Sequence, residues 1–285
     1  MEREQLQITV GELEQTEFIS YLYERENSEA TVAKYNTDIR TFYRFLKDDS
    51  QVNKAKLVAY KEWLMERYAV SSANSMIAAL NQFLIFLGAG SLRLKRICVQ
   101  KQMFLKDEKE MSKSEYKKLV ETARKLGRHK LALLMETICA TGIRISELPY
   151  FTVSAVRRGK IEVRNKGKIR IILMPEALRK KLLYFAEKEQ IKKGCIFVTR
   201  SGRPKNRSNI WAEMKALHKD AGVKAEKVFP HNLRHLFARV YYQMYKDIVG
   251  LADILGHSSL ETTRIYMASV SDVYRERFQK MQLVI

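Results

Sequence analysis

The spacing of apolar residues changes along the chain, and this change limits the folds that the sequence can form. Residues 12–48 carry apolar side chains at helical intervals, with Ile39 and Phe42 as examples, and residues 54–67 and 72–87 repeat the pattern. No strand signal interrupts these segments. The first part of the chain therefore predicts a compact domain made of helices.

After residue 88 the helical periodicity stops, and it returns only after a basic stretch. We expect a linker at residues 91–108 that lies along a partner. Beyond it, Ser112 and Glu115 have the spacing of a capping box at the start of an amphipathic helix. A more apolar helix is expected at residues 130–140, directly before the sequence TGIRISEL.

The next segment has the alternation of apolar and polar residues that is typical of a strand. The segment VSAVRRGKIEVRNKGKIRIILMP alternates β-branched and polar residues and has turn signals at Gly159 and Gly167. It predicts a small antiparallel sheet. Helices are expected again at roughly 176–190, 208–221, 231–245, 248–255 and 259–268, with a short tail helix at 271–281. The predicted fold is mainly α with a small antiparallel β-sheet, in two domains.

Electrical charge is distributed unevenly between these two parts. Residues 1–106 carry 15 Lys and Arg against 13 Asp and Glu, whereas residues 107–285 carry 37 against 19. The formal net charge of the chain is +20. A charge of this size favours a polyanionic partner, with nucleic acid ahead of an anionic membrane surface.

The remaining composition excludes several classes of protein. The three cysteines, Cys98, Cys139 and Cys195, are too few and too widely spaced for a disulfide framework or a zinc knuckle. The first residues lack the apolar core of a signal peptide, and no stretch approaches the roughly 18 apolar residues of a membrane span. We therefore expect a soluble, cytoplasmic protein without a membrane partner.

Histidines gather near the end of the chain. Three of the five, His231, His235 and His257, fall within residues 230–266. The first two belong to PHNLRH, the third to LGHSS, and Tyr266 follows His257 by nine residues. His231 and His235 have helical i, i+4 spacing, which can serve a metal, but the glutamate of an HExxH motif is absent. We expect no metal.

Together, TGIRISEL, PHNLRH, LGHSS and Tyr266 resemble the motifs of the tyrosine site-specific recombinases, the family of phage integrases and Xer-type enzymes. The resemblance covers nearly the whole chain and depends on several independent motifs in the right order. It implies a helical, SAM-like core-binding domain at 1–90, the linker at 91–108, an α+β catalytic domain with a three-stranded sheet at 109–270, and a tail helix at 271–285.

The resemblance also implies a reaction. Tyr266 would attack a DNA phosphate and leave a 3′-phosphotyrosyl link and a 5′-hydroxyl, which conserves the bond energy without ATP. Arg144 and Arg234 match the two arginines that clamp the phosphate, a task that suits a planar, permanently charged guanidinium. For Arg144 alone, a surface salt bridge with Glu147 is the ordinary alternative, and the presence of Arg234 favours the clamp. His231 matches the residue that manages the tyrosine proton, and His257 matches the one that hydrogen-bonds the phosphate.

A lysine in the β-hairpin turn supplies a proton to the leaving oxygen in this family. The turn here, RNKGKIR, is shorter than the usual one. Lys166 is the better match, and Lys168 is a competitor. A simple phosphate contact by both lysines is a further alternative.

Several basic residues outside these motifs are expected to touch DNA phosphates without reading sequence. The candidates are Arg93, Lys95, Arg96, Lys101, Lys168, Arg203, Lys205 and Arg207. A charge run on a solvated face is the ordinary alternative, and a half of the chain with such an excess of positive charge favours DNA.

The resulting hypothesis is a recombinase that integrates, excises, resolves or inverts DNA. It would act without cofactors on paired inverted-repeat sites in double-stranded DNA, as a homotetramer on DNA and a monomer in free solution. The tail at 271–285 would dock either on its own domain or in trans on a neighbour. The alternatives are a catalytically silent DNA-binding protein of the same fold and a type IB topoisomerase that relaxes DNA.

Overall fold

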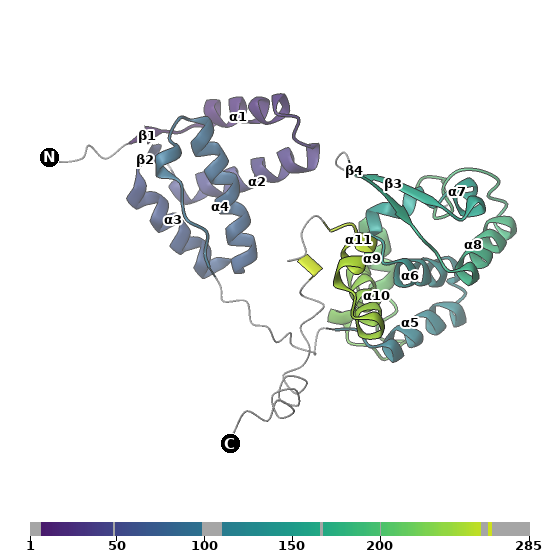
Figure 1. Cartoon of the computed structure of the whole chain (residues 1–285). Helices are drawn as coiled ribbons and strands as arrows, with labels where there is room; N and C mark the ends of the chain where they lie inside the picture. Colours follow the sequence, from purple (N-terminus) through teal and green to yellow (C-terminus); the bar gives the residue numbers. More distant parts are fainter. Residues whose placement is uncertain are drawn as a thin grey trace, which may run out of the picture. The chain divides into compact units, whose positions relative to one another are not determined.

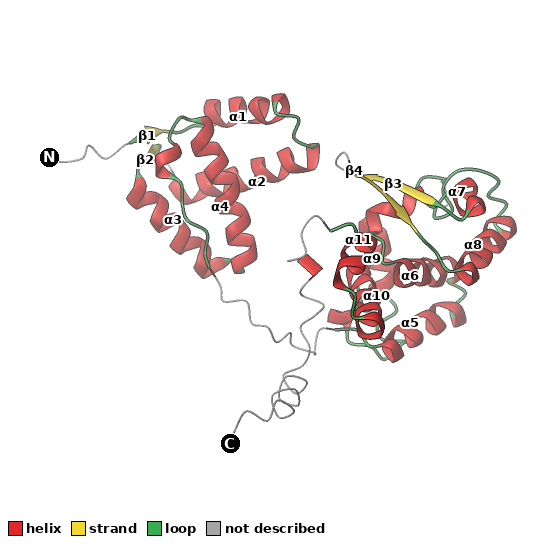
Figure 2. Cartoon of the chain, in the orientation of Figure 1, coloured by secondary structure: helices red, strands yellow, loops and turns green. Residues whose placement is uncertain are grey.

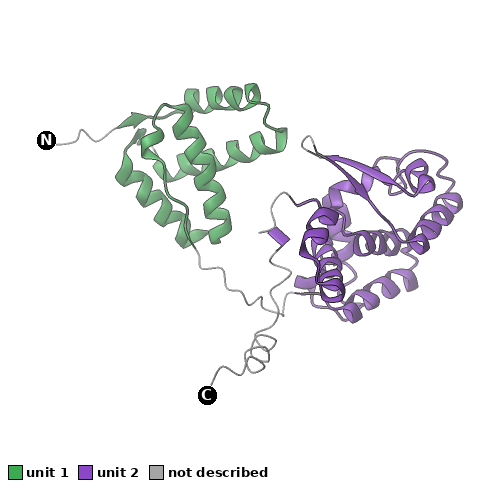
Figure 3. Cartoon of the chain, in the orientation of Figure 1, with its two compact units in different colours: residues 1–101 green, residues 102–285 purple. Residues whose placement is uncertain are grey.

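Helices dominate the described part of the protein, which also contains two small antiparallel sheets (Figure 2). The computed structural model describes residues 7–47, 49–98, 110–165, 168–199, 201–257 and 262–263. The chain divides into two units, residues 1–101 and residues 102–285 (Figures 1 and 3). The mainly helical fold with a small antiparallel sheet is the one that the sequence predicted.

The first unit is built from the helices α1 (Glu12–Glu24), α2 (Glu29–Leu46), α3 (Lys54–Arg67) and α4 (Val70–Phe86). Side chains start two of these helices: Ser28 accepts from the amide of Thr31 at the start of α2, and Asn53 accepts from the amide of Lys56 at the start of α3. The apolar stripes of the helices meet in one core, which contains Phe18, Ile39, Phe42, Leu64 and Phe83.

Two short strands correct the expectation of an all-helical first domain. Strand β1 (Ile8–Thr9) pairs antiparallel with β2 (Gln51–Val52), and Ile8 lies opposite Val52. Each strand has only two residues. A segment of this length is too short to leave a period-two pattern in the sequence.

Residues 90–97, the start of the predicted linker, run along helix α4. After the 3₁₀ turn η1 (Gly90–Leu92), the amide and carbonyl of Leu94 bond to the side chain of Asn81, and those of Ile97 bond to Asn74. Two helical turns rise about 10.5 Å, and three extended residues span about 10 Å. The spacing of the two asparagines therefore matches the extended chain.

The second unit contains the helices α5 (Lys113–Lys125), α6 (His129–Thr141), α7 (Val153–Arg158), α8 (Glu176–Lys188), α9 (Arg207–Lys215), α10 (Pro230–Tyr245) and α11 (Ile248–Leu255), with the 3₁₀ turns η3 (Ile145–Tyr150) and η4 (Ala225–Lys227). The capping box at the start of α5 is confirmed: Ser112 and Glu115 each accept from the other's backbone amide. No described helix in either unit has the length and apolarity to cross a membrane.

Helix α6 is the centre of this unit, since it packs against α5, α8, α9 and α10. It is buried along most of its length, including Leu134, Met135 and Ile138. It ends at Gly142, whose left-handed backbone (φ +63°) favours glycine. A Cβ at this position would also lie 2.4 Å from the ring of Phe237. Arg144 follows this turn after one residue, Ile143.

The sheet of the second unit is a hairpin of β3 (Ile161–Asn165) and β4 (Lys168–Ile172), in which Ile161 lies opposite Ile172. The described residues form two strands here, where the resemblance implied three. Residues 153–158, which we expected in the sheet, form α7 instead. Thr152 caps this helix at the amide of Ala155, and Val153 and Val156 are buried at helical spacing, so local capping and packing outweigh β-branching.

One other helix ends earlier than the sequence predicted, and two predicted helices lie wholly or mostly outside the described residues. Helix α9 ends at Lys215, and turns rather than helix continue to Gly222, which has φ +62°. The helix expected at 259–268 is described only at residues 262–263, and the tail helix lies outside the described residues.

Candidate active site

Arg234 of helix α10 is a buried arginine, with 1% of its surface exposed. Its guanidinium donates to the carbonyl of Gly142 at 2.6 Å and to the carbonyl of Leu255 at 2.7 Å. These carbonyls stand at the C-terminal ends of α6 and α11. A helix C-terminus has unpaired carbonyls and partial negative charge, so the meeting of two such ends stabilises a buried cation.

Arg144 lies at the start of the turn η3 and is only partly buried. Its guanidinium donates to Glu147 at 3.3 Å and to the carbonyl of Gly256 at 3.0 Å. Its amide donates to the same carboxylate at 2.7 Å. The ion pair with Glu147, which is the ordinary explanation for such an arginine, is therefore present. The side chain is nevertheless 33% exposed, whereas that of Glu147 is 2% exposed.

Glu147 has a second cationic partner, Arg170 of strand β4. The guanidinium of Arg170 donates to the carboxylate of Glu147 at 2.5 Å and also to the carbonyl of Ile254. A buried carboxylate requires paired charge and hydrogen bonds, and Glu147 obtains both from the two arginines.

His257 follows α11 in a tight turn. Gly256, with φ +62°, ends the helix, and the amides of Gly256 and His257 donate to the carbonyls of Asp253 and Ala252. The His257 ring lies between two side chains: Nε2 is 3.0 Å from a guanidinium nitrogen of Arg234, and Nδ1 is 2.8 Å from Oγ1 of Thr263.

The guanidinium fixes the tautomer of His257. Because an arginine has only donors, Nε2 of His257 accepts, and the proton of the neutral ring lies on Nδ1, which donates to Thr263. Desolvation and then the nearby Arg234 lower the pKa of His257 to about 4. The ring is therefore neutral at pH 7 in this arrangement.

His231 and His235 are one helical turn apart on α10, with ring centroids 4.5 Å apart at an angle of 70°. Desolvation and then the charge of Arg234 lower the pKa of His231, while desolvation and then His231 lower that of His235 to about 4. Both rings are neutral at pH 7. Among the residues described by the structure, no group of three His, Cys, Asp or Glu side chains gathers as a metal site would require.

A cavity of about 530 Å³ opens beside this cluster. Arg144, Arg207, Trp211 and His231 line it, together with Phe229 and residues 143, 145, 146 and 230. Arg207 is exposed at the first turn of α9. The lining of the cavity therefore includes two arginines, whose guanidinium groups favour the binding of a phosphate.

Thus Arg144, His231, Arg234 and His257, which lie up to 113 positions apart in sequence, meet at one site. Two other predicted site residues, Lys166 and Tyr266, lie outside the described residues. Lys168 is described only by its backbone, which begins β4 opposite Asn165.

The predicted DNA contacts differ in their surroundings. Arg93, Lys95 and Arg96 are exposed on the segment that runs along α4, and Arg203 is exposed on its loop. Lys205 is 12% exposed and pairs with Glu213 at 2.5 Å, so its charge is already shared. Lys101 lies outside the described residues.

Sequence reasoning gave Glu147 no role beyond a salt bridge and missed Arg170 and Thr263 entirely. The signal for Arg170 was its place in the sequence IRIIL, where it is the one charged residue among apolar ones. Thr263 is fully buried and lies three positions before Tyr266, but a single threonine in LETTRIY gives no signal.

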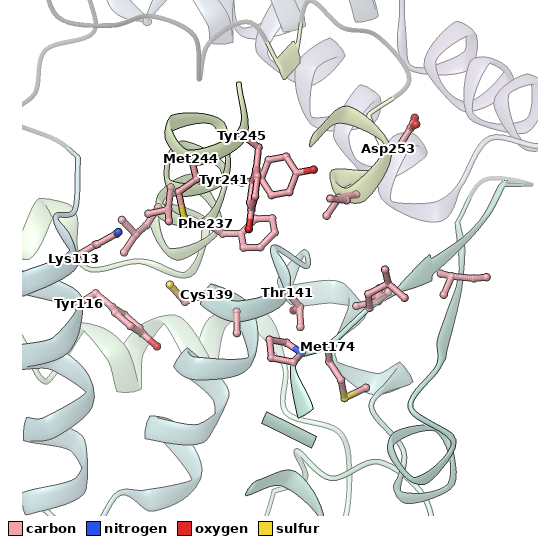
Figure 4. A pocket seen from close by; sticks show the side chains of 18 of the residues that line it. Lys113, Tyr116, Cys139, Thr141, Met174, Phe237, Tyr241, Met244, Tyr245 and Asp253 are labelled. Carbon is pink, nitrogen blue, oxygen red and sulfur yellow. The ribbon is translucent and has the colours of Figure 1, made fainter. Parts of the chain in front are cut away.

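An apolar groove of about 870 Å³ lies on the second unit, beside the hairpin (Figure 4). Its walls come from α5, the end of α6, strand β4 and α10, and include Tyr116, Cys139, Met174, Phe237 and Tyr241. Leu173, Met244 and Tyr245 line it while exposing 74%, 65% and 62% of their surfaces. Apolar side chains gathered at such exposure are typical of a protein-binding surface.

Comparisons with known proteins agree with the motifs. The sequence model of the phage integrase family matches residues 109–272, and that of the phage integrase N-terminal SAM-like domain matches residues 16–89. The chain is 27% identical over 264 residues to the tyrosine recombinase XerD of Vibrio cholerae, with 86% of this chain and 87% of that protein covered. It is also 27% identical over 277 residues to the tyrosine recombinase XerA of Pyrococcus horikoshii, with 94% and 93% covered.

Solved structures share the fold. The XerH recombinase bound to its difH substrate in a pre-cleavage complex has a TM-score of 0.67 and 17% identity, over 93% of this chain and 84% of that chain. The lambda integrase tetramer bound to a Holliday junction has a TM-score of 0.69 and 19% identity, over 92% and 78%.

Proposed function

Because the chain belongs to the phage integrase family, we propose that its site breaks and rejoins DNA strands through a covalent bond to Tyr266. The chain is a site-specific tyrosine recombinase. The observation that supports the assignment of the site is that Arg144, Arg234 and His257 meet where α11 ends. Arg144 donates to the carbonyl of Gly256, and Arg234 donates to the carbonyl of Leu255 and contacts His257.

In the first step, the phenol oxygen of Tyr266 forms a bond to phosphorus, and the bond from phosphorus to the 5′-oxygen breaks. The phenol proton passes to His231, whose neutral ring can accept it. Lys166 gives a proton to the leaving 5′-oxygen, with Lys168 as the alternative donor. In the second step, a 5′-hydroxyl of the partner strand attacks the phosphotyrosyl bond, and the protons return.

The two arginines stabilise the negative charge that gathers on the non-bridging oxygens during each step. Arg144 is partly exposed and reaches the phosphate from the surface, whereas Arg234 is held below it by two helix ends. Because both guanidinium groups are fixed before DNA arrives, little reorganisation is needed in the transition state. Removal of one such donor typically lowers the rate by about 10²–10³.

Nε2 of His257 must carry a proton before it can donate to the phosphate, either because the ring is protonated or because a tautomer shift lets the Thr263 hydroxyl donate to Nδ1. Its Nε2 accepts from Arg234 in the present arrangement. A bound phosphodiester carries a negative charge beside this ring and therefore favours the imidazolium, which has a donor on both nitrogens.

The substrate is double-stranded DNA with paired inverted-repeat sites, and the enzyme acts on it as a homotetramer.

We assign the apolar groove to residues 271–285 of a neighbouring copy. This segment contains Phe278, Met281, Leu283, Val284 and Ile285. The exposed Leu173, Met244 and Tyr245 provide the apolar surface that such side chains need. Since the substrate is cellular DNA, the proposal includes a cytoplasmic location.

In this proposal, basic residues outside the motifs contact the DNA phosphates: Arg93, Lys95, Arg96, Lys101, Arg203 and Arg207. Lys205 is already paired with Glu213 and contributes less. The silent DNA-binding and topoisomerase alternatives are not favoured, because the relatives over most of the chain are named tyrosine recombinases.

The test is covalent trapping. The protein is incubated with DNA from the region that flanks its own gene, denatured in SDS, and examined for a protein–DNA adduct. We expect an adduct with the wild type and with the control Tyr184→Phe, since Tyr184 is exposed on α8. Tyr266→Phe should abolish it. An adduct that persists in Tyr266→Phe would mean that another residue is the nucleophile.

A further inference from the structure

Arg170 occupies an unusual position in strand β4. Side chains alternate along this strand, and Ile169, Ile171 and Leu173 are 62%, 44% and 74% exposed. Arg170 points to the opposite face, with its side chain 15% exposed, together with the buried Ile172. An arginine on the inward face of a strand loses water and must recover hydrogen bonds from the protein.

The partners of Arg170 are the same groups that hold Arg144. One nitrogen of Arg170 donates to Glu147, whose carboxylate also binds the amide and the guanidinium of Arg144. The stem of Arg170 packs against Gly256, where a Cβ would lie 2.6 Å from Cδ, and the carbonyl of Gly256 accepts from Arg144. Arg170 thus touches both anchors of the exposed arginine.

Arg170 also holds the turn that carries His257. Its second nitrogen donates to the carbonyl of Ile254, in the last turn of α11, two residues before Gly256. In the sequence, Lys166 precedes Arg170 by four positions. One side chain therefore connects the hairpin, the start of η3 and the end of α11.

Charge explains why a second arginine is needed. If Glu147 had only Arg144 as a cationic partner, the buried carboxylate would compete with the DNA phosphate for the same guanidinium. Arg170 supplies a second positive charge from the interior, so Arg144 can direct donors outward. The exposures agree with this division, at 33% for Arg144 against 15% for Arg170.

We propose that Arg170 is a positioning residue for strand cleavage: it binds Glu147 and the turn at Gly256 so that Arg144 and His257 face the phosphate. The proposal rests on the proposed function of the site. Arg170 itself lies behind Arg144 and need not touch DNA.

The experiment measures the single-turnover rate of adduct formation and, separately, the Kd for the same DNA. Arg170→Gln should lower the rate by about 10²-fold, as loss of one preorganised donor does, while the Kd stays within about threefold. Arg170→Lys should have a rate between those of wild type and Arg170→Gln. The single nitrogen of an ammonium group cannot donate to Glu147 and Ile254 in the two fixed directions of a planar guanidinium.

Arg179→Gln is a matched control. Arg179 also donates to a carboxylate, that of Glu176, and to a main-chain carbonyl, that of Arg157, but on the surface of α8. Its rate should stay within about twofold of wild type, because exposed ion pairs contribute little. Thermal unfolding of every variant separates a loss of fold from a loss of rate.

A neutral phosphate distinguishes positioning from a merely structural role. A methylphosphonate at the scissile position replaces a charged oxygen by a methyl group, so an arginine clamp contributes less. The fold-reduction in rate that Arg170→Gln causes should be at least about tenfold smaller on this substrate. The coupling to Glu147 provides a second readout: in a Glu147→Gln background, Arg170→Gln should cost far less than in the wild type.

An Arg170→Gln rate equal to that of wild type overturns the inference, and so does a defect of the same size on both substrates. Absence of any adduct with wild-type protein would instead overturn the proposed function.

Discussion

The guanidinium of Arg234 donates to Nε2 of His257 across 3.0 Å, while Nδ1 of the same ring is 2.8 Å from the hydroxyl of Thr263. This relationship makes the state of His257 depend on what lies in the site. Without DNA the ring is neutral and serves as an acceptor for Arg234. With a phosphate beside it, the ring gains a partner for a second proton.

DNA binding should therefore take up protons near pH 6. The pKa of His257, held at about 4 by desolvation and Arg234, should rise when an anion approaches. Titration calorimetry in two buffers of different ionisation enthalpy measures the number of protons taken up. His257→Asn should reduce that number, and an unchanged number would assign the uptake to another group.

Replacement of Arg234 should reduce both stability and cleavage. Arg234→Gln leaves the carbonyls of Gly142 and Leu255 without their charged donor in a buried site. We expect a loss of about 2–4 kcal/mol in the free energy of unfolding, measured by urea denaturation. Arg179→Gln should change it by less than about 1 kcal/mol. A similar free energy of unfolding for the two variants would contradict the structural role of the buried Arg234 guanidinium.

Stability of the second unit should fall as the pH decreases from about 6.5 to about 4. The pKa of His235 is about 4 in the folded protein and about 6.5 in an unfolded chain, so the unfolded state binds the proton first. The contribution is complete above pH 6.5 and is lost as the pH falls toward 4. Urea denaturation at several pH values measures the slope, which one histidine can raise by at most about 1.4 kcal/mol per pH unit.

His235→Gln isolates this effect from that of the carboxylates. The variant should have a shallower pH dependence than the wild type over the same range, whatever its stability at pH 7. Parallel curves for the two proteins would exclude His235 as the source.

A charge in the apolar groove should prevent assembly. Leu173→Asp places a carboxylate on a wall that we assign to residues 271–285 of a neighbour, and burial of that charge is costly. Gel-shift experiments with paired sites should show single-protomer complexes but no tetramer. Leu126→Asp, an exposed position outside the groove, is the control. Normal tetramers with Leu173→Asp would exclude the groove as the docking surface.

Affinity for DNA should depend steeply on salt. If the complex neutralises about 6–10 phosphates, the binding constant should fall by about 10³–10⁵ between 50 and 200 mM salt. Arg207→Ala should reduce the slope of log K against log salt by about 0.9 if its side chain neutralises one phosphate. An unchanged slope would place Arg207 away from the DNA backbone.

The sequence was sufficient for most of the helices, because their apolar stripes and caps are local signals. The capping box of Ser112 and Glu115 is an example, since both partners lie within one helical turn. The sequence failed at α7, where the β-branched Val153 and Val156 suggested strand although their spacing also suits a helix. It missed β1 and β2, since two residues cannot show a period.

The candidate site was likewise predicted only in part. Motif residues such as Arg144 and His257 were identified by their order, and the structure brings them together. The network behind them was hidden because its bonds join residues far apart in sequence: Arg170 and Glu147 are separated by 23 positions, and Arg170 and Ile254 by 84. Only the fold reveals that an inward-facing arginine in β4 meets a buried glutamate in η3.

Arg170 lines the apolar groove as well as holding Glu147. Any segment lodged in the groove therefore meets the same side chain that aligns the phosphate clamp. In the arrangement that we propose, docking of a neighbour in the groove and alignment of the phosphate clamp share this one side chain.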